Sequence, residues 1–117
     1  MNFLLVGLGG SLGSIIRYSL SLLIPHATLT VNLFGSLIIG FLLGMGREKL
    51  GNEWGLFLVP GFLGGFTTFS AFSSESITML KNGFYGNLFL YLAVSVAGGV
   101  ILGMAGFYMG KLLLPSP

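Results

Sequence analysis

Charged residues are scarce in this sequence. They make up 7% of its 117 residues, whereas about 25% of the residues in soluble domains are charged. Cysteine is absent, which leaves the redox compartment of the protein open. The single histidine, His26, follows Pro25 in an expected turn and has neither a cysteine nor an acidic cluster to accompany it. Metal ligation and acid–base catalysis are therefore not expected at His26, and the sequence argues against an enzyme.

Apolar residues are correspondingly abundant, at 54% of the chain, and the mean hydropathy is +0.96. A bilayer core about 30 Å thick is crossed by roughly 20 helical residues. Four apolar segments are long enough, at about residues 2–24, 29–46, 54–80 and 86–114. Only short turns lie between them, so we predict an all-α membrane protein with a single four-helix transmembrane domain over residues 1–117.

Small residues recur four positions apart in three of these segments. Because lipid tails give apolar helices no reason to associate, small residues stabilise helix pairs by letting their backbones approach closely. The residues in this pattern are Gly9, Gly10, Gly13 and Ser14, then Ser36, Gly40 and Gly44, and finally Ser95, Gly99, Gly103, Gly106 and Gly110. The pattern predicts a tight bundle without a wide pore, so any pathway is narrow or lies between subunits.

Polar residues within the apolar segments form two stripes. Asn32 and Ser36 are four positions apart in the second segment, and Tyr91 and Ser95 repeat this spacing in the fourth. A polar group in hydrocarbon is unfavourable unless it meets a partner or water. Hydrogen bonding between helices explains each residue taken alone, but two stripes together favour a polar-lined path.

Two charged residues, Arg17 and Glu75, lie within the apolar segments and before their last turn. Arg17 is expected to face a wet vestibule, to cap a neighbouring helix end or to extend to the membrane interface. In a vestibule its charge would attract anions. Glu75 follows the hydroxyl-rich part of the third segment and is a candidate partner for Arg17.

The third segment contains GFLGGFTTFSAFSSE, at residues 61–75, which is unusual for a membrane helix. Its three glycines predict a loss of helical continuity, and the carbonyls freed by a break must be satisfied within the protein. Discontinuous membrane helices use such carbonyls to bind Na⁺. Beyond the break, Phe69 and Phe72 share a face with Ser70 and Ser73 beside them, and phenyl edges are positively polarised. These residues favour an anion path, although packing alone also explains a phenylalanine stripe.

Three motifs are distinctive together: GGSLGSIIRY at residues 9–18, TLTVNLFGSLIIG at residues 28–40 and, above all, GFLGGFTTFSAFSSE. With them the chain resembles the Fluc/CrcB family of small bacterial fluoride channels over essentially its whole length. The resemblance implies a fluoride-selective channel in the bacterial cell membrane that passively exports fluoride from the cytoplasm and so limits its toxicity. It also implies an antiparallel, dual-topology dimer of four-helix subunits with a break in the third helix and two narrow pathways.

The resemblance further assigns individual residues. It places a structural sodium ion at the dimer centre, held by the backbone carbonyls of Gly64 and Thr67 from both subunits. It matches the family's helix-one arginine to Arg17, and its fluoride pathway to Asn32, Phe69, Ser70, Phe72, Tyr91 and Ser95. We add Ser73 to this pathway because it lies beside Phe72. Three residues depart from the family's pattern: Ala71 stands where members often carry threonine, Gly99 where some carry serine, and Ser14 where alanine is common.

Two other functions are compatible with four short spans. A proton-coupled small multidrug exporter typically needs a membrane-embedded glutamate in its first helix, and residues 1–24 contain no acidic residue. A non-transporting membrane scaffold would share the small-residue pattern, but it has no use for a hydroxyl-lined helix break.

The basic residues in the turns and near the ends of the spans are divided unevenly, with Lys81 on one side and, on the other, Arg47, Lys49 and Lys111, while Arg17 is assigned to neither side. This bias mildly favours a cytoplasmic N-terminus. It is small enough for a homodimer inserted in both orientations, whereas a decisive bias would require a heterodimer with an oppositely oriented homologue.

Overall fold

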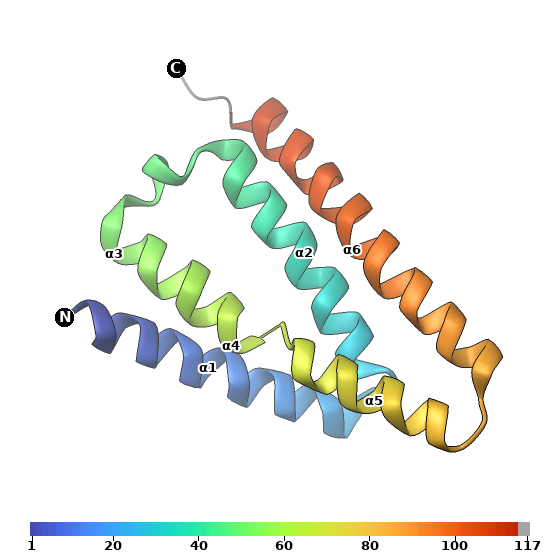
Figure 1. The fold of residues 1–117 in the computed structure, drawn as a ribbon. Helices are drawn as coiled ribbons and strands as arrows, with labels where there is room; N and C mark the ends of the chain where they lie inside the picture. The colour runs from blue at the N-terminus through green and yellow to red at the C-terminus, as the bar shows by residue number, and fades with distance from the viewer. Residues whose placement is uncertain (115–117) are drawn as a thin grey trace.

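The computed structural model describes residues 1–114, apart from the side chain of Arg47, and these residues contain helices and no strand (Figure 1). Three spans are single helices: α1 (Asn2–Leu23), α2 (Ala27–Met45) and α6 (Tyr85–Leu113). The other span is assembled from α3 (Gly51–Leu56), η2 (Phe57–Leu63), α4 (Gly64–Phe66) and α5 (Phe69–Lys81), after a short 3₁₀ turn, η1 (Arg47–Lys49).

Four stretches of this structure are long and apolar enough to cross a bilayer: Asn2–Leu23, Ala27–Met45, Gly51–Lys81 and Tyr85–Leu113. The predicted all-α membrane fold with four transmembrane helices, the third of them broken, is thereby confirmed. The chain is a multi-pass membrane protein.

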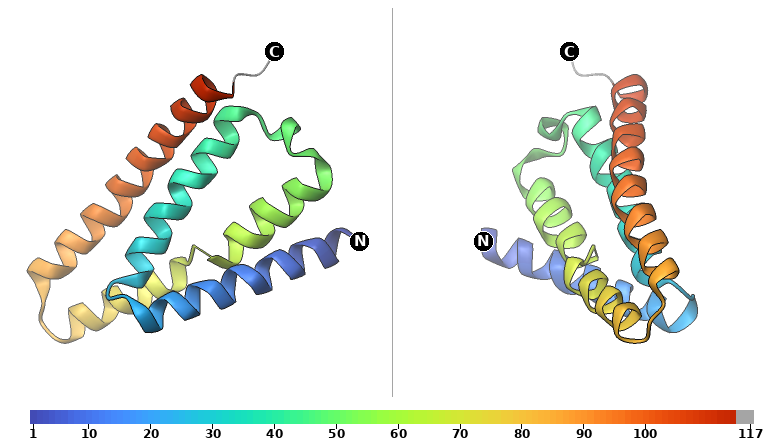
Figure 2. Two further views of the ribbon diagram at one scale, coloured as in Figure 1. Left: turned by 180° about the vertical axis from the view of Figure 1, so that it is seen from behind. Right: turned by 45° about the vertical axis from the view of Figure 1, so that its right-hand side comes forward.

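The spans form two pairs of parallel helices. α2 and α6 lie side by side along most of their length, and α1 lies beside α3, η2 and α4 (Figures 1 and 2). α5 leaves the second pair and packs against α2 and α6 near the start of both helices. The break in the third span therefore lies where the two pairs meet.

Glycines allow both pairs to approach backbone to backbone. A Cβ atom added at Gly40 or Gly44 would overlap the carbonyl oxygen of Gly103 or Phe107 on α6, and one at Gly106 would overlap the carbonyl of Leu37 on α2. The same close approach occurs in the other pair, where added Cβ atoms would overlap backbone atoms at Gly9, Gly13 and Gly65. The small-residue pattern therefore marks the helix contacts, as lipid-embedded packing requires.

The break falls later than the glycines of the sequence motif. Gly61 lies in the π-helical turn η2, which also contains Pro60, and Gly64 and Gly65 lie in α4. The backbone instead becomes extended at two β-branched residues, Thr67 (φ −125°, ψ 109°) and Thr68 (φ −119°, ψ 118°). The glycines were predicted to open the helix, and this is wrong for Gly65, which serves to pack the third span against α1. β-Branched residues are disfavoured in helices because the preceding turn restricts their side chains.

Few side chains are enclosed within a single chain. The buried apolar cluster consists of Val31 on α2 with Leu63 and Phe66 just before the break. Tyr91 on α6 is also buried. This core fixes the end of α4 against α2 and so positions the two residues of the break.

Candidate ion pathway at the helix break

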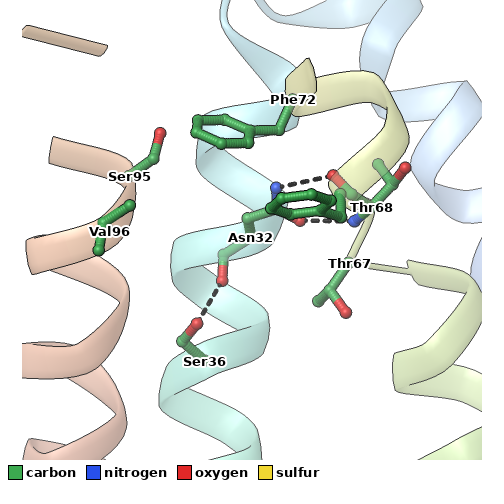
Figure 3. A pocket seen from close by; sticks show the side chains of 8 residues that line it. Asn32, Ser36, Thr67, Thr68, Phe72, Ser95 and Val96 are labelled. Atoms are coloured by element: carbon green, nitrogen blue, oxygen red, sulfur yellow. Dashed lines mark hydrogen bonds between the residues drawn. The ribbon is translucent and has the colours of Figure 1, made fainter. Parts of the chain in front are cut away.

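The side chain of Asn32 holds the extended backbone of the break. Its Nδ2 donates to the carbonyl of Thr68 at 3.2 Å, and its Oδ1 accepts from the Thr68 backbone N–H at 2.7 Å (Figure 3). Thr68 in turn caps α5, because its Oγ1 accepts from the backbone N–H of Ala71 at 3.2 Å. Asn32 thus pairs with Thr68 as a neighbouring strand would, and α5 restarts from a fixed point.

A pocket lies between the break and the α2–α6 pair. Figure 3 shows Ser95 and Val96 on α6 facing Asn32, Phe72 and the break across it. Its lining consists of Asn32, Ser36, Thr67, Thr68, Phe69, Phe72, Ser95 and Val96. Hydroxyl, amide and aromatic groups from three segments that are far apart in the sequence therefore surround one space.

One hydroxyl in this lining has no protein partner. The Oγ of Ser95 is buried and makes no hydrogen bond to the described residues, whereas the Oγ of Ser36 donates to the carbonyl of Asn32 at 2.8 Å. Buried polar atoms are normally hydrogen-bonded, and one that is not calls for a functional explanation. Ser95, a residue of the pocket lining, therefore carries a hydrogen-bond donor without a partner among the described residues.

Three aromatic rings contact one another at the pocket. The rings of Phe69 and Phe72 lie 5.7 Å apart between centroids, and that of Phe72 lies 5.2 Å from the ring of Tyr91. Phe69 is 78% exposed in the single chain. A large apolar side chain at a polar pocket is thus left uncovered by its own subunit.

Glu75 is held by two hydroxyl groups and not by Arg17. Its two carboxylate oxygens accept from Thr28 at the start of α2 and from the hydroxyl of Tyr91 on α6, the latter at 3.0 Å. The suggested pairing of Glu75 with Arg17 is therefore wrong. These bonds tie α5 to the two helices on which it packs.

Arg17 caps the broken helix, which is one of the three positions considered for it. Its Nε donates to the carbonyl of Gly65 at 3.2 Å, and the Oγ of Ser14, one turn earlier on α1, lies 3.5 Å from the same oxygen. Carbonyls at a helix C-terminus lack intrahelical donors and are stabilised by basic side chains. The guanidinium is half-buried in this position.

The break leaves other carbonyls free. Both the backbone N–H and the hydroxyl of Thr67 donate to the carbonyl of Leu63. The carbonyls of Gly64 and Thr67 accept no hydrogen bond from the described residues, and Gly64 is exposed. No group of three His, Asp or Glu side chains in the described part of the chain could hold a metal ion, so backbone oxygens are the available hard ligands.

The family of this chain follows from comparison with known proteins. The family described as CrcB-like protein, Camphor Resistance (CrcB), matches residues 4–107. The chain belongs to this family.

Individual relatives of this CrcB chain match it over most of its length. The fluoride-specific ion channel FluC 1 of Listeria monocytogenes is 41% identical over 118 residues, which cover 94% of this chain and 98% of the relative. FluC of Thermus thermophilus is 42% identical over 122 residues, with 97% and 98% covered. FluC of Chlorobium phaeobacteroides is 44% identical over 119 residues, with 94% and 92% covered.

The structure of this CrcB-family chain brings together four of the seven residues predicted for the pathway, namely Asn32, Phe69, Phe72 and Ser95. The ring of Tyr91 contacts that of Phe72, and the hydroxyl of Ser70 lies 3.1 Å from that of Thr68. Ser73 is half-buried outside the pocket lining.

Sequence reasoning missed Thr68 and Thr28. The signal for Thr68 was its position as a threonine directly before a helix, which is typical of an N-cap. No local signal reveals Thr28, because its partner, Glu75, is 47 residues away in the sequence.

Proposed function

We propose that this protein is a fluoride-selective channel through which fluoride leaves the cytoplasm passively. The observation that carries the proposal is the unpartnered hydroxyl of Ser95 in a pocket lined by an asparagine and two phenylalanines. The names of the three relatives, each a fluoride-specific ion channel, support fluoride as the ion.

The chemistry of the pocket suits a small, strongly hydrated anion. A narrow pathway conducts such an ion by replacing its water with donors, and it excludes larger ions by its diameter. Here the donors are the hydroxyl of Ser95, the second N–H of the Asn32 amide and the positively polarised edges of Phe69 and Phe72. None of them carries a full charge that would trap the ion. A membrane potential that is negative inside would drive the anion outward with about 2.3 kcal/mol per 100 mV.

A second subunit completes the site in this proposal. Extended backbone at membrane depth is tolerated only where it is buried in protein or lines a cavity, yet Gly64 beside the break is exposed and Phe69 is 78% exposed. A partner placed over this face would cover both. The small bias in basic residues permits an antiparallel homodimer, and a heterodimer with an oppositely oriented homologue is the alternative.

The same partner would complete a structural sodium site. The free carbonyls of Gly64 and Thr67 are hard oxygen ligands of the kind that discontinuous membrane helices offer to Na⁺, and two subunits would supply two from each chain. Bound there, sodium would satisfy oxygens that otherwise face hydrocarbon and would join the two breaks. The donor set therefore fits the ion.

Efflux from vesicles tests the proposed function. The purified chain alone is reconstituted into liposomes loaded with fluoride or with chloride, and release is followed with ion-selective electrodes. We expect rapid release of fluoride without release of chloride. A protein that assembles but releases neither ion would match a scaffold or a subunit that needs a different partner, and release driven only by a proton gradient would match an exporter.

A further inference from the structure

The carbonyl oxygens around the break are divided between two classes. That of Leu63 accepts from Thr67, that of Gly65 accepts from Arg17, and that of Thr68 accepts from Asn32. Those of Gly64 and Thr67 accept from none of the described residues. Occupied and free oxygens thus lie close together in this segment, and three of the donors, Ser14, Arg17 and Asn32, are side chains on other helices.

Two of these donors, Arg17 and Asn32, hold the two sides of the break. Arg17 lies on α1 and fixes the last turn before the break, 48 residues away in the sequence. Asn32 lies on α2 and fixes the residue from which α5 restarts, 36 residues away. The helices that carry them are joined by a short turn at residues 24–26. Two helices that are consecutive in the sequence, α1 and α2, therefore hold the two ends of the break.

We propose that Arg17 and Asn32 are positioning residues that set which carbonyls of the break are free to bind a cation. By occupying the oxygens of Gly65 and Thr68, they leave those of Gly64 and Thr67 fixed in direction and without a protein partner. This inference rests on the proposed sodium site and gives Arg17 a role other than attracting anions at a vestibule.

The inference gives Asn32 two roles that can be separated. As a ligand of fluoride it would affect only ion release, whereas as a positioning residue it also affects how strongly sodium binds. Its two hydrogen bonds to Thr68 use the Oδ1 acceptor and one N–H of the amide, which leaves the other N–H for an ion. Sodium dependence is therefore the decisive measurement for Asn32.

The test measures sodium binding without reference to fluoride. The melting temperature of the purified, detergent-solubilised protein is recorded over a range of sodium concentrations, with N-methylglucamine replacing sodium at constant ionic strength. A ligand that binds the folded state raises the melting temperature in a concentration-dependent manner. The variants are Arg17→Gln, Arg17→Lys and Asn32→Ala, and fluoride efflux is measured in parallel.

Matched controls lie two positions away on the same helices. Ser19 and Thr30 each donate only to a carbonyl of their own helix, those of Ile15 and His26, and both are exposed. Ser19→Ala and Thr30→Val therefore remove a hydrogen bond without touching the break.

We expect the sodium concentration at half-maximal stabilisation to rise roughly tenfold in Arg17→Gln and Asn32→Ala. A change of this size corresponds to the loss of about one well-placed hydrogen bond. Arg17→Lys, which keeps the charge but loses the planar Nε donor, is expected to show a smaller rise and provides a readout if the other two variants fail to assemble. Ser19→Ala and Thr30→Val should match the parent protein.

Unchanged sodium midpoints in the Arg17 and Asn32 variants, or equal shifts in the controls, would overturn the inference. A parent protein whose melting temperature does not depend on sodium concentration would overturn both the inference and the sodium site. The proposed fluoride channel would be unaffected by that result. Conversely, a sodium-dependent protein that released no fluoride would refute the channel and retain the positioning role.

Discussion

The two halves of the third span are held in different ways. Before the break, η2 and α4 pack backbone to backbone against α1, and Gly61, Leu63 and Phe66 are buried. After the break, α5 contains no fully buried residue and is held by hydrogen bonds from other helices. The first half is therefore a structural element that tolerates little change. The second half offers its aromatic and hydroxyl side chains to an ion and to a partner.

This difference predicts that substitutions before the break act on folding, and that substitutions after it act on ion flow. The contrast can be tested by comparing the two halves and the helices that contact them.

The largest effect on stability is expected at the α1 contact of the first half. A Cβ atom at Gly9 would overlap the carbonyl of Phe57 and lie 2.8 Å from the backbone nitrogen of Phe62. Because neither backbone atom can move independently of its helix, we expect Gly9→Ala to cost about 1–3 kcal/mol, the range for overpacked cores. The measurement is the melting temperature and the yield of assembled protein.

Gly7→Ala is the matched control for Gly9→Ala, since an added Cβ at Gly7 meets nothing within 4 Å. Equal melting temperatures for the two variants would show that α1 and the third span pack less closely than the structure indicates.

A large effect on flux, with little effect on folding, is expected at the start of the second half. Phe69→Ile removes a polarised ring edge at the pocket but no buried contact, since Phe69 is 78% exposed in the single chain. A lost aromatic interaction of about 0.5–1.5 kcal/mol slows fluoride release up to roughly tenfold. Liposome efflux gives the rate, and size-exclusion chromatography verifies the assembly.

Phe3→Ile makes the same chemical change on α1 at a side chain that is 94% exposed. It should release fluoride at the parent rate, and a parent-like rate in Phe69→Ile would remove that ring from the pathway.

A moderate effect on stability is expected where α5 is tied to α6. Tyr91→Phe keeps the ring beside Phe72 but removes the hydroxyl that donates to Glu75. The expected loss is about 0.5–1.5 kcal/mol, the net value of one hydrogen bond. Thermal denaturation measures this loss, with Tyr18→Phe as the control because the side chain of Tyr18 on α1 is 63% exposed. A Tyr91→Phe variant as stable as that control would argue against a stabilising hydrogen bond between Tyr91 and Glu75.

The smallest effect on stability is expected at Ser95. Because its buried hydroxyl has no partner in the described residues, Ser95→Ala removes an unsatisfied group and should change stability by less than about 0.5 kcal/mol. Fluoride release should nevertheless slow, since a donor to the ion is lost. Parallel melting and efflux measurements separate the two effects, and a clear destabilisation would indicate that the hydroxyl has a structural partner.

The sequence by itself determined the class of this protein, the number of its spans and the faces on which they meet. The length of an apolar segment and the four-residue spacing of its small residues are properties of a single helix. They can therefore be recognised without knowing which helices pack against it. The motif around residues 61–75 also indicated a broken helix and a phenylalanine-lined site.

Only the tertiary structure decided where the helix breaks and which side chains hold the break in place. Its position at Thr67 and Thr68, the cap of Arg17 on Gly65 and the bonds of Glu75 to Thr28 and Tyr91 were not legible from the motif. The reason is that the contacts of Arg17, Thr28 and Asn32 join residues 48, 47 and 36 positions apart. A polar side chain in a membrane must find some partner, but the packing of the helices alone selects which one.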